Sequence, residues 1–326
     1  MKVVKNFGGD APWGVIPYIQ RNLDLLSDDN SDDVFFNGVQ FIDSKELRDK
    51  YKHNRRKALL SHWSPCEFLV RQDYHYFDAY DFFTEVYCVC PFTCDFMNQY
   101  FGYEKFKYIP YPFTNNTVTK FGDYDSLCTW FGSIHGDDHI KAIETISKYN
   151  YKFITSQQNT WMHHPYEYNK CTHVNISTDQ KLIEVSKTKS SLTFNKLYMN
   201  HSSRNNKNYN GLINKSFDFF EEKIMPQFKV RTHEIATCKS LILCFKDQWN
   251  LIEDFYEENV DFIYFENFEE LNFILENFDQ NFNKYEKIIE NAFSKVQNYT
   301  VEKIFDYIKT NDSSLITWKN KNFGKH

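Results

Sequence analysis

The sequence lacks the long apolar segments that mark membrane and secreted proteins. It contains no run of about 18 apolar residues, so no transmembrane helix is expected. Residues 1–6, MKVVKN, do not form the apolar stretch of a signal peptide. No internal repeat and no low-complexity stretch is found along the chain. These absences predict a globular protein of the cytoplasm.

A surplus of basic residues is also absent. The chain carries 38 Lys and Arg against 44 Asp and Glu, which is a net charge of −6. Proteins that bind nucleic acid through their overall electrostatic field need a basic surface to contact the phosphates. The net negative charge therefore argues against this mode of nucleic-acid binding. The densest basic segment comprises Lys50, Lys52, Arg55, Arg56 and Lys57. We interpret it as a solvated loop or helix end, and a local basic groove is the alternative.

The cysteines do not form the pattern of a disulfide framework or of a zinc site. Eight of them are spread over 326 residues, mostly inside apolar, strand-like runs. Without a secretion signal, such residues are expected to be reduced core thiols. Cys90 and Cys94 lie close together, but no second Cys/His pair stands at zinc-ligand spacing. The acidic pair Asp123 and Asp125 lies in a polar segment, so we expect no metal site.

The sequence does contain a regular alternation of strand-like and helical segments. Hydrophobic residues make up 41% of the chain and aromatic residues 18%, which is enough for two cores. This alternation predicts α/β domains with mostly parallel sheets covered by helices. Predicted strands span residues 2–7, 34–37, 57–61, 86–90, 107–109, 126–131, 151–155, 191–195 and 240–245. Predicted helices span residues 15–26, 44–51, 94–101, 137–149, 179–187, 231–237 and 284–310, and a final pair of elements spans 262–264 and 268–278.

A polar segment at residues 110–126 divides the chain into two halves, each with the same alternation of predicted strands and helices. We predict an N-terminal Rossmann-like domain at 1–113, a linker at 114–125 and a C-terminal domain at 126–310. A tail or helix at 311–326 is predicted to pack back on the N-terminal domain. Ligands of open α/β sheets bind at the carboxyl ends of the strands, so a cleft between two such domains is the expected site.

The most informative stretch, residues 229–244, joins a short helix to a buried strand. Arg231 lies at the helix N-terminus, where free N–H groups and the positive end of the dipole favour a diphosphate. One turn later, Glu234 could accept hydrogen bonds from a ribose diol, as acidic residues do in dinucleotide folds. The alternative is a capped surface helix on which Arg231 and Glu234 form a salt bridge.

This stretch resembles the donor-binding segment of GT-B glycosyltransferases, particularly the group 1 and CgeB-like proteins. These carry an Arg-x-x-Glu helix before a small-residue turn and an apolar strand. The similarity covers about residues 226–308 and includes Asp247, Ile252-Glu253 and Glu269-Glu270-Leu271. It implies two Rossmann-like domains facing across a cleft, with the acceptor domain first and the nucleotide-sugar donor domain second. Many retaining members carry a second glutamate eight positions earlier, where this chain has Pro226, so the stereochemical course stays open.

Two further segments belong to the donor site that the resemblance implies. The turn FGSIHG, residues 131–136, follows the first strand of the second domain and offers Gly132, Ser133 and His135 near the donor diphosphate. Glycine at such a turn lets the backbone approach a phosphate closely. As a bare motif, an ordinary tight turn is an equal alternative. Asn195, at the end of a predicted strand, completes the donor-binding residues of this domain.

The loop after the first strand of the chain, NFGGDAPWG, is implied to face the cleft. Gly8 and Gly9 are expected to contact the donor. Asp10 is a candidate general base for the acceptor hydroxyl, a role that needs a carboxylate within hydrogen-bond reach. Its alternative role is to cap the following helix. His62, at another strand end, is the rival base.

These features together predict a glycosyltransferase that moves a hexosyl or pentosyl group from a nucleoside-diphosphate donor to a hydroxyl acceptor. Arg231 and helix N-termini would stabilise the leaving nucleotide, so we expect no metal and no cofactor besides the nucleotide-sugar co-substrate. Lys, Asn, Phe, Tyr and Ile dominate the chain, as they do when an AT-rich genome biases codon usage. This bias, with the absence of export signals, favours a viral or bacterial cytoplasmic enzyme. The acceptor would be a glycan or a modified base of phage DNA, the one role left for nucleic acid. The alternatives are a nucleotide-binding protein without turnover and a nucleotide-sugar epimerase.

Overall fold

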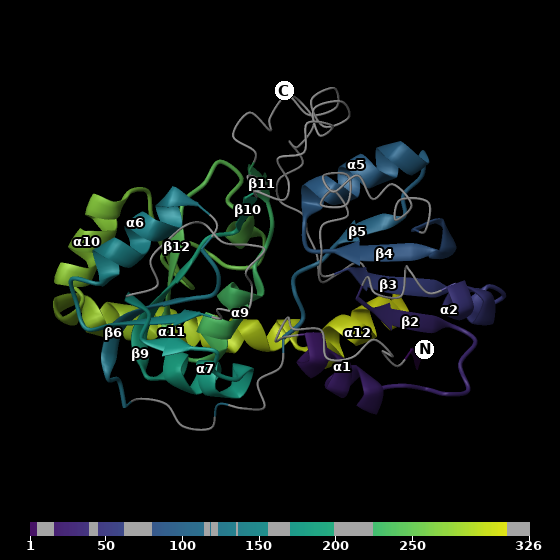
Figure 1. The fold of residues 1–326 in the computed structure, drawn as a ribbon, viewed down its shortest axis with the longest axis horizontal. Helices are drawn as coiled ribbons and strands as arrows, with labels where there is room; N and C mark the ends of the chain where they lie inside the picture. Colours follow the sequence, from purple (N-terminus) through teal and green to yellow (C-terminus); the bar gives the residue numbers. More distant parts are fainter. Residues whose placement is uncertain are drawn as a thin grey trace. The chain divides into compact units, whose positions relative to one another are not determined.

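The computed structural model describes residues 1–4, 16–38, 45–61, 80–113, 118, 123–134, 136–155, 170–198 and 224–311 (Figure 1). The chain forms two compact units. The first unit comprises Met1–Thr114, Arg204–Phe228 and Tyr299–His326, and the second comprises Asn115–Ser203 and Lys229–Asn298. Each unit contains a parallel sheet with helices, which confirms the predicted α/β class.

The first unit is built on a five-stranded parallel sheet in the order β1-β2-β3-β4-β5. Its strands are β1 (Lys2–Val3), β2 (Val34–Asn37), β3 (Lys57–Ser61), β4 (Glu85–Cys88) and β5 (Phe106–Tyr108), and the short strand β11 (Ile224–Pro226) also belongs to this unit. Its helices are α1 (Ile16–Leu25), α2 (Lys45–Tyr51), α5 (Pro91–Phe101) and α12 (Val301–Thr310). Strands β2 and β4 are buried along their whole length, so the sheet forms the centre of the unit.

Helix α5 begins earlier than the predicted range of 94–101. Pro91 occupies the first helical turn, where its missing N–H leaves no partner unsatisfied. The Cys90 Sγ accepts a hydrogen bond from the Thr93 N–H at 3.4 Å and so caps the helix. A thiol cap is an uncommon start signal, which explains the missed first turn.

Helix α12 packs on the first sheet, beside α1 (Figure 1). The Phe305 ring meets the Phe35 ring edge-on, with 5.3 Å between the centroids. Arg56 donates hydrogen bonds to the carbonyl oxygens of Ile308 and Lys309 at the end of the helix. Arg56 therefore caps α12, although the sequence predicted a solvated basic segment at this position.

The boundary of the second unit differs from the predicted domain of 126–310. The chain passes from that unit to the first within a short 3₁₀ turn, Gln297–Tyr299, which separates α11 (Phe282–Val296) from α12. The amphipathic pattern of residues 284–310 indicates helices but not which sheet each one covers. The predicted tail at 311–326 lies outside the described residues except for Asn311.

The second unit is built on a six-stranded parallel sheet in the order β13-β12-β9-β6-β7-β8. Its strands are β6 (Ser126–Phe131), β7 (Tyr151–Thr155), β8 (His173–Val174), β9 (Thr188–Thr193), β12 (Leu241–Phe245) and β13 (Ile263–Phe265), and β10 (Lys196–Tyr198) also lies in this unit. After β6, the chain adds β7 and β8 on one side of this strand. It then adds β9, β12 and β13 on the other side. The order therefore reverses between β6 and β9, as in a Rossmann fold.

Helices cover this second sheet (Figure 1). They are α6 (Asp137–Ile146), α7 (Thr178–Ser186), α9 (Val230–Thr237), α10 (Phe268–Glu276) and α11 (Phe282–Val296). Aromatic rings fill much of the core between sheet and helices. The Phe194 ring stacks on Phe245 with 5.0 Å between centroids, and Phe265 meets Phe245 edge-on at 5.5 Å. Part of the high aromatic content thus serves packing.

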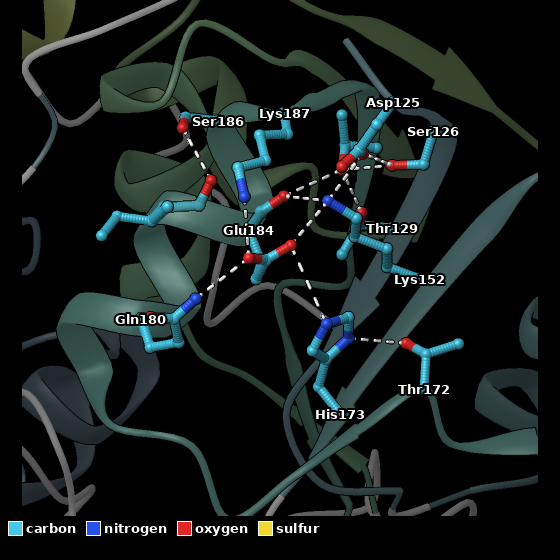
Figure 2. A network of polar contacts seen from close by, with 12 residues as sticks. Asp125, Ser126, Thr129, Lys152, Thr172, His173, Gln180, Glu184, Ser186 and Lys187 are labelled. Atoms are coloured by element: carbon cyan, nitrogen blue, oxygen red, sulfur yellow. Dashed lines mark hydrogen bonds and ion pairs between the residues drawn. The ribbon is translucent and has the colours of Figure 1, made fainter. Parts of the chain in front are cut away.

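A polar network joins α7 to the sheet (Figure 2). The Lys152 Nζ lies 2.9 Å from Glu184 Oε2 and 2.7 Å from Asp125 Oδ1. The Glu184 Oε1 accepts hydrogen bonds from Gln180 Nε2 and Lys187 Nζ, each at 3.0 Å. Burial alone would raise the pKa of Glu184, but the hydrogen bonds from Lys152 and Lys187 lower it to about 2. The carboxylate is therefore charged at neutral pH and fixes the end of α7 to β6 and β7.

No helix within the described residues is long and apolar enough to cross a membrane. The seven described cysteines are free thiols, and all of them except Cys171 are buried. These positions match the prediction of core thiols, and Cys66 lies outside the described residues.

Candidate functional site

The candidate site lies at the carboxyl edge of the second sheet, between β6 and β9. The strand order reverses at this point, and open α/β sheets bind ligands in the crevice outside such a reversal. Gly132 follows β6, Asn195 follows β9, and Arg231 lies at the start of α9. Gly132 lies against the Arg231 side chain, and Asn195 is hydrogen-bonded to the residue before α9. The structure thus brings together three segments that the sequence predicts for the donor site.

The Arg231 guanidinium lies on two aromatic rings. Its Cζ is 4.5 Å from the centroid of the Trp130 ring and 5.3 Å from that of Phe131. Burial lowers the pKa of Arg231 to about 10, against the opposing effect of Glu234, so the group is protonated at neutral pH. Within the part of the chain that the structure describes, this guanidinium makes no ion pair and no hydrogen bond. A half-buried guanidinium with unused donors is suited to bind an anion.

Gly132 makes room for this guanidinium. Its φ of +112° lies in a region that L side chains rarely adopt. A Cβ at this position would lie 2.1 Å from Arg231 Nη2, which is far too close for any contact. The glycine is therefore needed to seat Arg231, and its direct contact with a donor stays a prediction. Ser133 follows it and is half-buried, whereas His135 lies outside the described residues.

Asn195 fixes the start of α9. Its side chain is 1% exposed, and its Oδ1 accepts hydrogen bonds from the Lys229 N–H at 2.9 Å and from Thr232 Oγ1 at 3.2 Å. Lys229, the N-cap residue, makes no side-chain hydrogen bond to the first-turn N–H groups of the described helix. The positive end of the α9 dipole is thus held beside Arg231. Direct donor binding by Asn195 stays a prediction.

Helix α6 also starts at this edge, directly after the Gly132 turn, but it is less suited to a phosphate. Its first turn contains Asp137 and Asp138, whose carboxylates face the positive end of the dipole. Asp138 accepts a hydrogen bond from the His139 N–H at 2.8 Å and forms an ion pair with Lys196 at 2.6 Å. Because carboxylates repel phosphates, the charge distribution favours the start of α9 over the start of α6.

Glu234 lies on α9 one turn after Arg231 and is 6% exposed. Its Oε1 is 2.6 Å from the Nζ of Lys181 on α7. The ion-pair partner of Glu234 is therefore Lys181, and the alternative of an Arg231–Glu234 salt bridge is wrong for the described structure. Sequence analysis missed Lys181 because the two residues are 53 positions apart, and a lysine on a helix gives no local signal of such a contact.

His233 also lies on α9 but belongs to the core. Its side chain is fully buried, and its Nδ1 lies 2.7 Å from the Tyr256 hydroxyl. Burial lowers the pKa of His233 to about 3, so the ring is neutral at physiological pH. This histidine therefore supports the packing of α9 and does not add charge to the site.

Several predicted site residues lie outside the described residues, namely Gly8, Gly9, Asp10, His62 and His135. In the described ranges, no group of three His, Cys, Asp or Glu side chains could hold a metal ion. Asp125, of the acidic pair Asp123 and Asp125, forms an ion pair with Lys152 at the amino end of β6, away from the carboxyl edge.

Comparison with protein families gives a match over the second half of the chain. Residues 140–310 match the model of a family described as glycosyl transferase-like. The matched range runs from α6 to α12 and includes both Arg231 and Glu234. No curated protein sequence matches the chain.

Solved structures with similar folds are also found. HepE of Anabaena, in complex with UDP-glucose, is 14% identical with a TM-score of 0.54, over 90% of this chain and 80% of HepE. Sucrose-phosphate synthase of Thermosynechococcus elongatus is 10% identical with a TM-score of 0.53, over 91% of this chain and 77% of the synthase. A glycosyltransferase of Rickettsia africae is 11% identical with a TM-score of 0.50, over 94% and 83%. Identities this low show the fold alone, and the fold is the predicted GT-B type.

Proposed function

Because this chain belongs to the glycosyl transferase-like family, we propose that it transfers a sugar from a nucleoside-diphosphate donor to a hydroxyl acceptor. The acceptor oxygen would form a bond to the anomeric carbon while the bond from that carbon to the diphosphate breaks. The nucleoside diphosphate leaves with the electron pair, and a general base takes the acceptor proton. HepE, whose fold is similar, is bound to UDP-glucose, which supports this donor class.

The observation that carries the proposal is the Arg231 guanidinium, which is protonated, half-buried and without an anion among the described residues. It lies at the start of α9, where backbone N–H groups add positive potential. Negative charge develops on the diphosphate as the sugar leaves, and Arg231 would stabilise it. We propose that this charge replaces a metal ion, so the nucleotide-sugar is the co-substrate and no cofactor is required.

The remaining roles are assigned from the sequence. Glu234 would accept hydrogen bonds from the ribose diol through the carboxylate oxygen that Lys181 leaves free. Asp10 or His62 would be the general base. The transferred group is proposed to be a hexose or pentose and the acceptor a glycan or a modified phage DNA base. The cytoplasmic location and the viral or bacterial origin stay predictions.

A thermal-shift screen of nucleotide-sugars tests the donor class first. A donor held at about 100 times its Kd should raise the stability by about 2.7 kcal/mol. Incubation with that donor then separates the alternatives. A transferase releases nucleoside diphosphate, an epimerase releases an epimer without an acceptor, and a pure binder consumes nothing.

Substitutions of Arg231 and Glu234 test where the donor binds. Charged hydrogen bonds are worth about 1.5–3 kcal/mol, so Glu234→Gln should lower nucleotide affinity roughly 10- to 150-fold in titration calorimetry. Arg231→Ala should lower it at least as much, since it removes the charge that faces the diphosphate. Lys239→Ala is the matched control, because Lys239 is at the other end of α9 and pairs with the exposed Glu290 at 2.7 Å. Wild-type affinity in both site variants would show that the donor binds elsewhere.

A further inference from the structure

We propose that Lys181 is a positioning residue that keeps Arg231 available for the diphosphate by binding the Glu234 carboxylate. The inference rests on the proposed function, because it concerns how the donor site maintains a free cation. It assigns a role to a residue of α7 that belongs to none of the predicted donor-binding segments.

The contacts place Lys181 between the two charged residues of α9. Its Nζ is 2.6 Å from Glu234 Oε1 and 5.5 Å from the centroid of the Phe131 ring. The same ring lies 5.3 Å from the Cζ of Arg231. Two cations thus share one aromatic ring, yet only Lys181 is paired with the carboxylate.

Charge balance explains why this pairing matters. Arg231 and Glu234 lie three residues apart on α9, a spacing at which oppositely charged side chains can pair. Glu234 is 6% exposed, so its carboxylate needs a cationic partner. Burial lowers the pKa of Arg231, whereas the charge of Glu234 raises it, so the two groups already attract each other. If an uncharged residue replaced Lys181, Arg231 would be the cation available to the Glu234 carboxylate. The guanidinium would then no longer be free to bind an anion.

Inorganic pyrophosphate is the probe that isolates this effect, because it has no ribose for Glu234 to bind. Lys181→Met keeps most of the length of the side chain and removes its charge. It should lower pyrophosphate affinity at least about 10-fold in calorimetry, because the loss of a charged hydrogen bond from Arg231 to the ligand lowers affinity by about this factor. The double variant Lys181→Met/Glu234→Gln should restore affinity to within about 3-fold of Glu234→Gln alone, because no carboxylate is then left to occupy Arg231.

Lys187→Met is the matched control, since Lys187 is the residue after α7 and pairs with Glu184 at 3.0 Å. It loses the same charge and a similar ion pair, and pyrophosphate affinity should stay within about 2-fold of wild type. Melting temperatures of all variants show whether each one is folded under the conditions of the titration.

The outcomes separate the inference from the proposed function. If Lys181→Met lowers only the melting temperature while Arg231→Ala weakens pyrophosphate binding, Lys181 is a structural partner and the inference is overturned alone. Loss of affinity in Lys181→Met that Glu234→Gln does not rescue would make Lys181 a phosphate ligand, which also overturns it. Unchanged affinity in Arg231→Ala would overturn the proposed donor site together with the inference.

Discussion

At the residue scale, the Arg231 guanidinium occupies the space that a side chain at position 132 would fill. The Arg231 Nη2 lies 2.1 Å from where a Cβ of residue 132 would be, and the φ of Gly132 is +112°. Any side chain at 132 would displace the guanidinium from the Trp130 and Phe131 rings. The position of the cation therefore depends on a residue that carries no charge and has no side chain.

Gly132→Ala should reduce nucleotide affinity about as strongly as Arg231→Ala, roughly 10-fold or more, because the guanidinium is displaced. It should also lower the free energy of unfolding by about 1–2 kcal/mol, since alanine is strained at this φ. Calorimetric titration and urea unfolding measure the two effects.

Gly102→Ala is the control for backbone strain alone. Gly102 has a φ of +74°, but a Cβ added there would meet no atom within 4 Å. This variant should lose stability and keep its nucleotide affinity. Equal affinity in Gly132→Ala and wild type would show that Gly132 does not position the Arg231 guanidinium that we propose for the diphosphate.

Sequence analysis found the charged residues of the candidate site but not the contacts that arrange them. Arg231 and Glu234 were recognised because they lie three residues apart on a short predicted helix that precedes an apolar strand. Lys181 is held to Glu234 across 53 positions, and no periodicity or spacing encodes such a pair. Arg56 was predicted to be solvated for the same reason, because the carbonyl groups it caps lie far along the chain.

At the element scale, most helices and strands follow from the sequence, because each buries its own apolar pattern. Strands β2, β3, β6 and β7 have the predicted bounds. Strand β9 is Thr188–Thr193, earlier than the predicted 191–195, because it begins directly after α7. Its polar residues include Ser190 and Ser191, which are fully buried, so hydrophobicity alone did not mark its start.

The network around Glu184 predicts how α7 and β9 respond to acid. The folded-state pKa of Glu184 is about 2, below the roughly 4.3 expected in the unfolded chain. The carboxylate therefore stabilises the fold above about pH 4.3, and this contribution is lost as the pH falls toward 2. Glu184→Gln should lower the free energy of unfolding by about 1–3 kcal/mol at pH 7 and make it less dependent on pH between about 4.5 and 2.

Urea unfolding at several pH values measures this difference. Glu290→Gln serves as the control, since Glu290 is 52% exposed and pairs with Lys239 near the surface. An exposed pair contributes about 0–1 kcal/mol, so this variant should resemble wild type. A Glu184→Gln protein with the acid dependence of wild type would contradict the role of the network.

At the scale of the whole molecule, the alternation of strands and helices predicts two α/β units, and the structure has two. The order of strands within each sheet could not be predicted. In the second sheet β9 inserts next to β6, which places Asn195 and the start of α9 beside Gly132. This long-range arrangement creates the candidate site, and it follows from tertiary packing.

Catalysis by the whole enzyme should persist in a chelator. The positive charge at the diphosphate is proposed to come from Arg231 and the α9 N-terminus, so removal of divalent ions should leave the rate nearly unchanged. Release of nucleoside diphosphate from the best-binding nucleotide-sugar, with and without EDTA, is the measurement. Activity that disappears in EDTA and returns with manganese would refute the metal-free proposal.

The placement of α12 in the first unit has a consequence for protein synthesis. The last strand of the five-stranded sheet in that unit is β5 (Phe106–Tyr108). Helix α12 (Val301–Thr310) is translated roughly 10–40 s later, at about 5–20 residues per second. Until α12 has left the ribosome, the Phe35 ring lacks its Phe305 neighbour and Arg56 has no helix end to cap. We therefore expect the N-terminal sheet to stay partly uncovered while the other unit is synthesised, and exposed apolar surface of this kind favours chaperone binding to the nascent chain.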